Sequence, residues 1–200
     1  RAKKPIGIYW LQAFSTKVFG SEEIGSFRVP SLLSALISIF FIGLLTRLIF
    51  PLYQTIVVTL LFSSTITFMG EAHLAKTDAT LLCLICIQQY YLLKLILDKK
   101  KSFRVKYLYP VIIWFAFSFG VLVKGPLSLA ILIPTVILFC YFQKSIELIR
   151  KLKPIIGFII CAFIILPWFF AIQEATQGVF LQKALNEDFF SKLQSGQEGH

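Results

Sequence analysis

The chain of 200 residues is 57% hydrophobic and contains 21 phenylalanines, with a mean hydropathy of +0.79. Soluble domains are typically about 45–50% apolar, so this composition predicts a membrane protein. The net charge of +10 would suggest nucleic acid as the partner of a soluble protein. Here the basic residues stand beside long apolar runs, so we expect membrane lipids as the partners of this charge and no nucleic acid.

The N-terminal segment, residues 1–28, is too polar to cross a bilayer. Residues 8–19 place apolar side chains on one helical face and polar side chains on the other. Tyr9 and Trp10 are amphipathic aromatic residues of the kind that gather at the headgroup level. We therefore predict an interfacial amphipathic helix that ends at Gly20.

Six apolar runs follow, each close to the roughly 20 residues that cross a hydrocarbon core of about 30 Å. The predicted spans are residues 29–50, 54–70, 78–97, 107–123, 127–143 and 154–173. The fold class is therefore an all-α membrane protein of about six transmembrane helices, with a core at 29–173 and a tail segment at 174–200. Cys83 and Cys86 form a CxxC without a second pair or a histidine, so we interpret them as small buried hydrophobic residues.

The charge of the connections predicts how the spans are oriented. One set of connections contains two acidic residues, Asp98 and Glu147, and many basic ones. The basic residues are Arg47, Lys94, Lys99, Lys100, Lys101, Arg104, Lys106, Lys144, Arg150, Lys151 and Lys153. By the positive-inside rule this side faces the cytoplasm. Six spans then place both ends of the chain, the connection at 71–78 and the hairpin at Lys124 together on the opposite side.

Three groups of polar residues on that opposite side are candidates for a functional site. Lys3 and Lys4, directly before Pro5, either snorkel toward lipid headgroups or hold the phosphate of a lipid-linked substrate. Asp78 opens a span, where its carboxylate either caps the helix or takes part in chemistry. Lys124 stands alone between two apolar spans, where a charged side chain is energetically unfavourable. It either reaches water from the hairpin or has a function that offsets this unfavourable energy.

A metal site has weaker support in the sequence. Glu71 and His73 could supply ligands, but no third ligand stands beside them, so a solvated loop is the simpler interpretation. Lys192 and His200 lie in the tail, where composition alone assigns them no role.

Seven short elements occur in order across nearly the whole chain. They are Lys4-Pro5-Ile6-Gly7-Ile8-Tyr9-Trp10, Phe19-Gly20-Ser21-Glu22, Arg28-Val29-Pro30-Ser31, Ala75-Lys76-Thr77-Asp78, Val123-Lys124-Gly125-Pro126, Leu166-Pro167-Trp168, and Glu187-Asp188-Phe189-Phe190-Ser191-Lys192 with Gly196-Gln197-Glu198-Gly199-His200. Together they resemble the bacterial integral-membrane glycosyltransferases of the GT-C fold, relatives of the protein O-mannosyltransferases and of the lipid A aminoarabinose transferase.

The resemblance implies transfer of a sugar from a polyprenyl-phosphate carrier to a cell-envelope acceptor (lipid A, a glycan or a protein) at the periplasmic face of the bacterial inner membrane. Lys4 would contact the carrier phosphate and Lys192 would be the second cation. Asp78, Lys124 and His200 would line or brace the cavity. Inverting transfer needs a carboxylate base for the acceptor and cations for the leaving phosphate.

Two departures from the family pattern bear on these expectations. The family's catalytic acid lies in a loop upstream of the first element and outside this sequence, so we expect a fragment that is truncated at both ends and inactive alone. Lys3 stands where the family usually has an acidic residue, so no cofactor is implied with certainty and a divalent metal stays an open alternative.

The alternative functions are a membrane transporter, a non-catalytic lipid-phosphate-binding protein and a structural membrane subunit. A transporter would favour paired broken helices related by an inverted repeat, which the sequence does not show. A structural subunit would leave Lys4, Asp78 and Lys124 pointing away from one another.

Overall fold

The computed structural model describes residues 5–20, 23–98 and 102–176, and all regular structure within these ranges is helical. The α-helices are α1 (Gly7–Phe19), α2 (Ile24–Arg47), α3 (Leu52–Ser63), α4 (Ile66–His73), α5 (Asp78–Leu97), α6 (Tyr109–Lys124), α7 (Leu129–Gln143), α8 (Glu147–Leu152) and α9 (Pro154–Thr176). A π-helical turn at Arg104–Leu108 leads into α6, and a 3-10 turn at Gly125–Ser128 joins α6 to α7.

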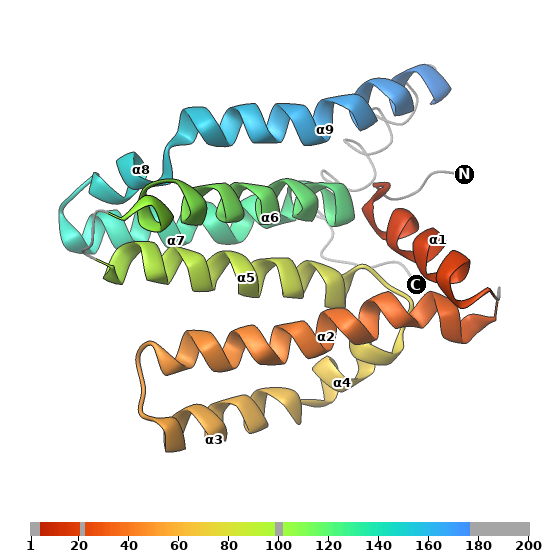
Figure 1. The fold of residues 1–200 in the computed structure, drawn as a ribbon, viewed down its shortest axis with the longest axis horizontal. Coiled ribbons are helices and arrows are strands. Elements are labelled where there is room, and N and C mark those ends of the chain that lie inside the picture. The colour runs from red at the N-terminus through yellow and green to blue at the C-terminus, as the bar shows by residue number, and fades with distance from the viewer. Residues whose placement is uncertain (1–4, 21–22, 99–101, 177–200) are drawn as a thin grey trace, which may run out of the picture.

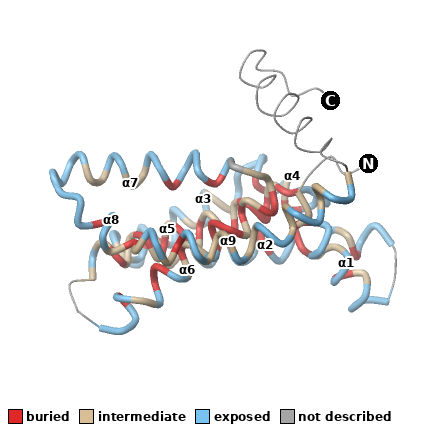
Figure 2. Tube along the Cα trace, turned by 90° about the horizontal axis from the view of Figure 1, so that it is seen from above, coloured by how far each residue is buried: buried red, intermediate tan, exposed pale blue. Residues whose placement is uncertain are grey.

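The long helices form one layer in which α3, α2, α5, α6 and α9 follow one another across the molecule (Figure 1). The helix α7 lies off this layer (Figure 2), and Leu132 is its one buried residue. The main hydrophobic cluster sits toward the end of the layer that carries α8, where Leu92, Leu95 and Ile113 are buried almost completely. This packing fixes α5 against α6 as an antiparallel pair.

A stripe of small side chains on α2 explains its close packing against α5. Ser31, Ser34, Ala35 and Ser38 recur at helical spacing and are all buried. Small residues let two helices approach closely in lipid, where no hydrophobic driving force acts between helices. The Ser34 hydroxyl donates to Thr80 Oγ1 at 3.3 Å across this contact.

The predicted span at 54–70 is not one straight helix. The helices α3 and α4 meet at a bend of 60°. Three consecutive hydroxyls turn back onto the end of α3: Ser63 donates to Leu60 O at 3.0 Å, Ser64 to Leu61 O at 3.0 Å and Thr65 to Phe62 O at 2.8 Å. The break itself lies at Thr65, whose backbone is extended (ψ 132°) and whose N–H donates to Phe62 O at 3.3 Å in place of the Leu61 carbonyl that a continuing α-helix would use.

Among the described residues, four helices are long and apolar enough to cross a membrane, namely α2, α5, the run Arg104–Lys124 and α9. The bent pair α3 and α4 makes a fifth candidate. The helix α7 has 15 residues, or about 22 Å at 1.5 Å per residue, so it is shorter than the predicted span at 127–143. The all-α membrane fold is confirmed. The number of spans differs from the predicted six because one predicted span is bent, at α3 and α4, and another is short, at α7.

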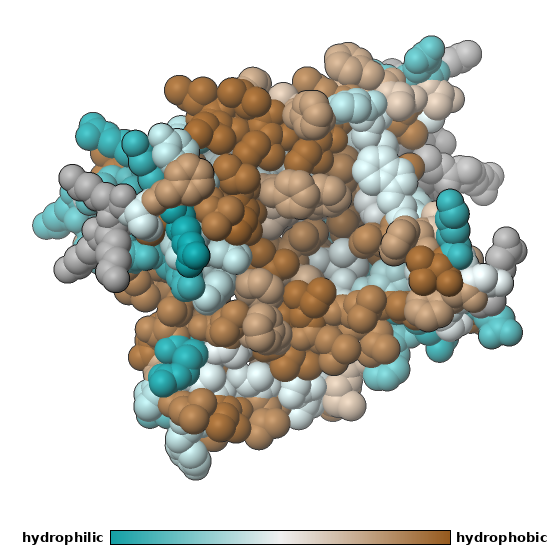
Figure 3. Space-filling view, in the orientation of Figure 1, coloured by the Kyte–Doolittle hydropathy of each residue, from teal (hydrophilic) through white to brown (hydrophobic). Residues whose placement is uncertain are grey.

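The surface fits a multi-pass membrane protein. Figure 3 shows a broad apolar belt across the middle of the molecule, with the hydrophilic side chains gathered toward its two ends. The residues of α9 are exposed or partly exposed, and Gly157 is its one buried residue. Such an apolar face would be unfavourable in water and is ordinary in lipid.

The helix α1 confirms the helix predicted at 8–19, and Gly20 ends it at a φ of 62°. Two of its polar residues face the protein, because Ser15 Oγ donates to Ser26 O at 2.6 Å and Gln12 Nε2 donates to Ala75 O at 3.4 Å. Its apolar residues Phe14 and Val18 are exposed. This arrangement suits a helix that lies on a membrane surface with its apolar face toward lipid.

Candidate functional site

Asp78 and Lys124 form an ion pair at the end of the bundle that also carries α1. Asp78 is the first residue of α5 and Lys124 is the last residue of α6, so the antiparallel packing of these helices brings the two residues together. Lys124 Nζ donates to Asp78 Oδ1. The Lys124 side chain is 31% exposed and the Asp78 side chain is 36% exposed. The pair is therefore open to a polar group arriving from solvent.

The capping role considered for Asp78 is not observed. The residue at the N-cap of α5 is Thr77, and no side chain makes a capping hydrogen bond there. The carboxylate of Asp78 instead contacts Lys124. Each charge still lies at the helix end that favours it, because an N-terminus stabilises an anion and a C-terminus a cation.

A close contact at Gly120 holds the turn that follows Lys124. A Cβ at Gly120 would lie 2.2 Å from Ser128 Oγ, so a side chain at this position would clash. Gly125 adopts a φ of +71°, a conformation that residues with a side chain rarely adopt. The chain therefore reverses tightly after α6, as the predicted hairpin requires, and Lys124 projects from a firmly packed turn.

The first turn of α1 packs directly on the last turn of α6. A Cβ at Gly7 would lie 2.7 Å from Leu122 O and 3.0 Å from Val123 Cγ2. Because the obstructing atom at Leu122 is backbone, the contact allows only glycine. The element that begins at Lys4 in the sequence thus approaches the Asp78–Lys124 pair through Gly7, three residues further along the chain.

The connection between α4 and α5 forms another side of this region. Ser31 Oγ donates to Lys76 O at 3.3 Å, and Lys76 Nζ lies 3.7 Å from Glu71 Oε1. The side-chain oxygens Thr77 Oγ1 and Glu71 Oε2 are buried without a hydrogen-bond partner in the part of the chain that the structure describes. Such groups usually find a partner, so this connection offers buried polar atoms beside Asp78.

The structure gives Glu71 and His73 protein partners. Glu71 contacts Lys76, and His73 Nδ1 is 2.8 Å from Met69 O. Within residues 5–20, 23–98 and 102–176, no group of three histidine, cysteine, aspartate or glutamate side chains is placed to hold a metal ion. Cys83 and Cys86 are buried and free, as expected of small hydrophobic residues.

Of the predicted site residues, Asp78 and Lys124 are brought together. Lys4, Lys192 and His200 lie outside the described residues. The contacts at Gly7 and Gly120 were missed by the sequence analysis, as was the bond from Gln12 to Ala75. At Gly120 the available signal was a glycine inside a predicted span, where glycine is unfavourable without a packing reason. Gly7 lies just before the predicted helix at 8–19, so no such signal was present there.

Comparisons with known proteins agree with this architecture. The family model described as dolichyl-phosphate-mannose-protein mannosyltransferase matches residues 3–170. A search of curated proteins found no match.

Two solved structures of ArnT from Cupriavidus metallidurans are similar to the chain, each at 20% sequence identity. The apo structure has a TM-score of 0.80, with 90% of this chain and 33% of that chain covered. The structure bound to undecaprenyl phosphate has a TM-score of 0.84, with 94% of this chain and 34% of that chain covered. The chain thus has the GT-C fold and spans about a third of the length of these solved chains.

Proposed function

This chain belongs to the dolichyl-phosphate-mannose-protein mannosyltransferase family, and we therefore propose that it forms the donor-binding core of a glycosyltransferase. The donor is a sugar carried on polyprenyl phosphate, and the acceptor is a component of the cell envelope. The observation that carries the proposal is the ion pair of Asp78 with Lys124, at the end of the bundle against which α1 packs.

The proposed chemistry assigns Lys124 to the phosphate of the carrier. When the acceptor oxygen attacks the anomeric carbon, the bond from that carbon to the phosphate oxygen breaks and the polyprenyl phosphate leaves with extra negative charge. A fixed ammonium stabilises that charge. Asp78 is the counter-ion of Lys124 while the site is empty, and the carrier phosphate takes its place on the ammonium when it binds.

Lys4 and Lys192 complete the proposal as further cations for the phosphate, and His200 braces the cavity. The sequence order supports Lys4, because it precedes the segment whose Gly7 packs on Leu122. The membrane core of the proposal covers residues 29–173, between the interfacial segment 1–28 and the tail 174–200.

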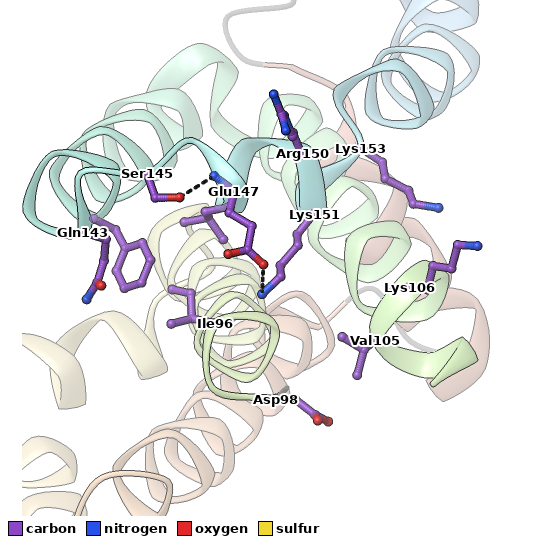
Figure 4. A pocket seen from close by; sticks show the side chains of 12 residues that line it. Ile96, Asp98, Val105, Lys106, Gln143, Ser145, Glu147, Arg150, Lys151 and Lys153 are labelled. Carbon is purple, nitrogen blue, oxygen red and sulfur yellow. Dashed lines mark hydrogen bonds and ion pairs between the residues drawn. The ribbon is translucent and has the colours of Figure 1, made fainter. Parts of the chain in front are cut away.

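We further propose that the Asp78–Lys124 end of the bundle faces the periplasm of a bacterial inner membrane. Arg150, Lys151 and Lys153 lie at the opposite end, around α8 (Figure 4). A concentration of basic residues at one end supports a cytoplasmic position for that end.

Binding of undecaprenyl phosphate to the purified chain in detergent tests the proposal. Binding is the right measurement because it reports on the carrier phosphate directly and needs no acceptor. Lys124→Gln should weaken a saturable affinity by about 10- to 100-fold, as expected when a charged hydrogen bond is lost. Asp78→Asn keeps the ammonium and removes a carboxylate that competes with phosphate, so affinity should hold or rise.

Lys17→Gln is the matched control, because Lys17 is an exposed lysine on α1 at the same end of the bundle. It should bind as the wild type does. Equal binding by Lys124→Gln and the wild type would contradict the assignment of Lys124. Equal losses in Lys124→Gln and Asp78→Asn would identify the pair as a structural clasp and favour a structural membrane subunit.

A further inference from the structure

A second polar site lies at the opposite end of the bundle from Asp78 and Lys124. It is a pocket of about 870 Å³ between the end of α5, the π-helical turn, the end of α7 and the helix α8 (Figure 4). Apolar side chains, including Ile96, Val105, Phe139 and Leu148, line one part of it. Basic and acidic side chains line the rest, so the pocket is amphipathic.

The charged lining is predominantly basic. Four basic residues oppose Asp98 and Glu147: Lys106, Arg150, Lys151 and Lys153. Lys151 Nζ pairs with Glu147 Oε1 at 3.0 Å (Figure 4). Among the described residues, Lys106, Arg150 and Lys153 form no ion pair with a carboxylate. The pocket therefore keeps positive charge that its own acidic residues do not neutralise.

Two of these cations share one aromatic ring. Lys153 Nζ lies 3.5 Å from the centroid of the Tyr107 ring, and Lys106 Nζ lies 5.1 Å from the same centroid. A cation–π contact orients an ammonium group without cancelling its charge. Two ammonium groups held beside one ring repel each other, and an anion between them would offset that repulsion.

The backbone at Lys153 is held in place by contacts on both sides. Lys153 adopts a φ of 50°, which is uncommon for a residue with a side chain. Leu152 O, directly before it, accepts a hydrogen bond from Trp114 Nε1 at 2.7 Å. Gly157 lies directly against the Trp114 ring. A Cβ at Gly157 would lie 2.1 Å from the nearest ring atom. These contacts fix the turn that presents Lys153 to the pocket.

Exposed apolar side chains flank the pocket. Phe103 precedes the π-helical turn, while Tyr141, Phe142 and Ile146 lie around the end of α7, and all four are exposed. A ligand bound here would thus meet positive charge and apolar surface together. Membrane phospholipids with an anionic headgroup have this combination, and basic pockets at the cytoplasmic side of transmembrane helices are known to bind such headgroups.

We propose that this pocket binds the phosphate headgroup of an anionic phospholipid in the membrane leaflet opposite the Asp78–Lys124 pair. Lys106 and Lys153 contact the phosphate oxygens, Arg150 adds positive charge at the rim, and the acyl chains lie along the exposed apolar residues beside the pocket. The assignment depends on the membrane fold and on these side chains, and it does not require the proposed glycosyl transfer.

Native mass spectrometry of the full chain tests this proposal. The protein is released from detergent micelles that contain phosphatidylglycerol or, in parallel, phosphatidylcholine. The wild type should retain phosphatidylglycerol in preference to phosphatidylcholine. The triple variant Lys106→Gln, Arg150→Gln, Lys153→Gln should lose at least about 10-fold in affinity for phosphatidylglycerol, because each basic group near an anionic lipid surface contributes to binding.

Two control variants and a second ligand, undecaprenyl phosphate, make the result specific. Lys17→Gln removes one exposed positive charge at the far end of the molecule and should leave phosphatidylglycerol binding unchanged. The double variant Lys106→Arg, Lys153→Arg keeps both positive charges and should bind phosphatidylglycerol as the wild type does. This result would show that the triple variant loses binding through loss of charge and not through misfolding. The triple variant should still bind undecaprenyl phosphate if Lys124 holds that ligand at the other end.

Equal retention of phosphatidylglycerol by the wild type and the triple variant would overturn the proposal. Competition by inorganic phosphate at the same concentration as the lipid would also overturn it, because the site would then hold a free anion. A wild type that binds both phospholipids equally would show that this surface does not select charge. An acidic soluble protein that displaces phosphatidylglycerol would identify a protein-docking surface in place of a lipid site.

Discussion

Single residues set the geometry of the candidate site through very short backbone approaches. Gly7 is the clearest case, because the carbonyl oxygen of Leu122 leaves no room for a Cβ. The carbonyl belongs to the last turn of α6, and Lys124 ends that helix two residues later. A change of one methyl group at Gly7 should therefore alter the position of α1 against the site.

Gly7→Ala tests this contact. The added methyl should push the start of α1 away from α6 and lower the free energy of unfolding by about 1–3 kcal/mol, as overpacking does elsewhere. Affinity for undecaprenyl phosphate should fall as well. Thermal unfolding followed by circular dichroism in detergent measures the first effect, and the binding assay measures the second.

Gly25→Ala is the matched control for Gly7→Ala. Nothing lies within 4 Å of a Cβ at Gly25, in the first turn of α2. Alanine there should stabilise the helix by up to about 1 kcal/mol, because glycine is the poorer helix former. A Gly7→Ala chain as stable as the Gly25→Ala chain would show that the α1 contact is not tight.

At the residue scale, the sequence pointed to Asp78 and Lys124 as unusual charges, but it could not predict that they contact each other. Asp78 and Lys124 were identifiable because a charge is costly beside long apolar runs. Their contact depends on α5 and α6 being adjacent and in register, which local sequence does not specify. Ser31 could not be assigned its bond to Lys76 O for the same reason, since 45 residues separate the two.

At the scale of helices, α6 and α9 are joined through the ring of Trp114. The ring lies against Gly157, and its Nε1 donates to Leu152 O at 2.7 Å. This contact fixes the start of α9, where Gly157 is buried. Further along the helix, Ser118 Oγ donates to Cys161 Sγ at 3.2 Å, and Cys161 packs against the main hydrophobic cluster. These two contacts together hold α9 against α6.

Gly157→Ala should separate α9 from α6. A Cβ at this position would lie 2.1 Å from the Trp114 ring, so we expect the free energy of unfolding to fall by about 1–3 kcal/mol. Thermal unfolding of the purified chain provides the measurement.

Combining Gly157→Ala with Trp114→Leu removes the ring that the methyl meets. The double variant should then lose less than the sum of the two single losses, because the two side chains share one contact. Additive losses would show that the ring does not limit the approach of α9. Gly43→Ala is the control, since its Cβ would meet Thr59 Oγ1 at an ordinary 3.5 Å.

The apolar runs predicted the helices because a span of lipid demands about 20 apolar residues. The sequence bounded α5 at 78–97 correctly because polar residues mark both ends. It missed the bend between α3 and α4, since Ser63, Ser64 and Thr65 are compatible with a continuing helix. Ser38 and Thr46 bond back to carbonyls in the same way within the unbroken α2.

At the scale of the molecule, the two ends of the bundle differ in chemistry. One end carries the Asp78–Lys124 pair and α1, and the other carries the basic pocket around α8. The predicted charge asymmetry follows from counting basic residues in the connections, so it needed no tertiary structure. The pocket did need it, because Lys106 and Lys153 meet at Tyr107 only after the helices have packed.

The proposed orientation predicts which ends a membrane-impermeant thiol reagent can reach. In a chain whose native cysteines are replaced by alanine, Lys17→Cys should react in intact cells from the periplasmic side. Lys144→Cys, at the other end after α7, should react only after the membrane is opened. Labelling in the reverse order would invert the orientation, and labelling of both in intact cells would contradict a bilayer-spanning arrangement.

The pair of helices α5 and α6 is fastened at both of its ends. Asp78 and Lys124 join one end. At the other, Lys94 Nζ lies 5.0 Å from the ring centroid of Tyr90, on its own helix, and 5.8 Å from that of Tyr109, on α6. Two helices fastened in this way cannot slide past each other without breaking one of the fastenings. We therefore expect the pair to move as one rigid unit, so that a displacement of one end would tilt both helices together.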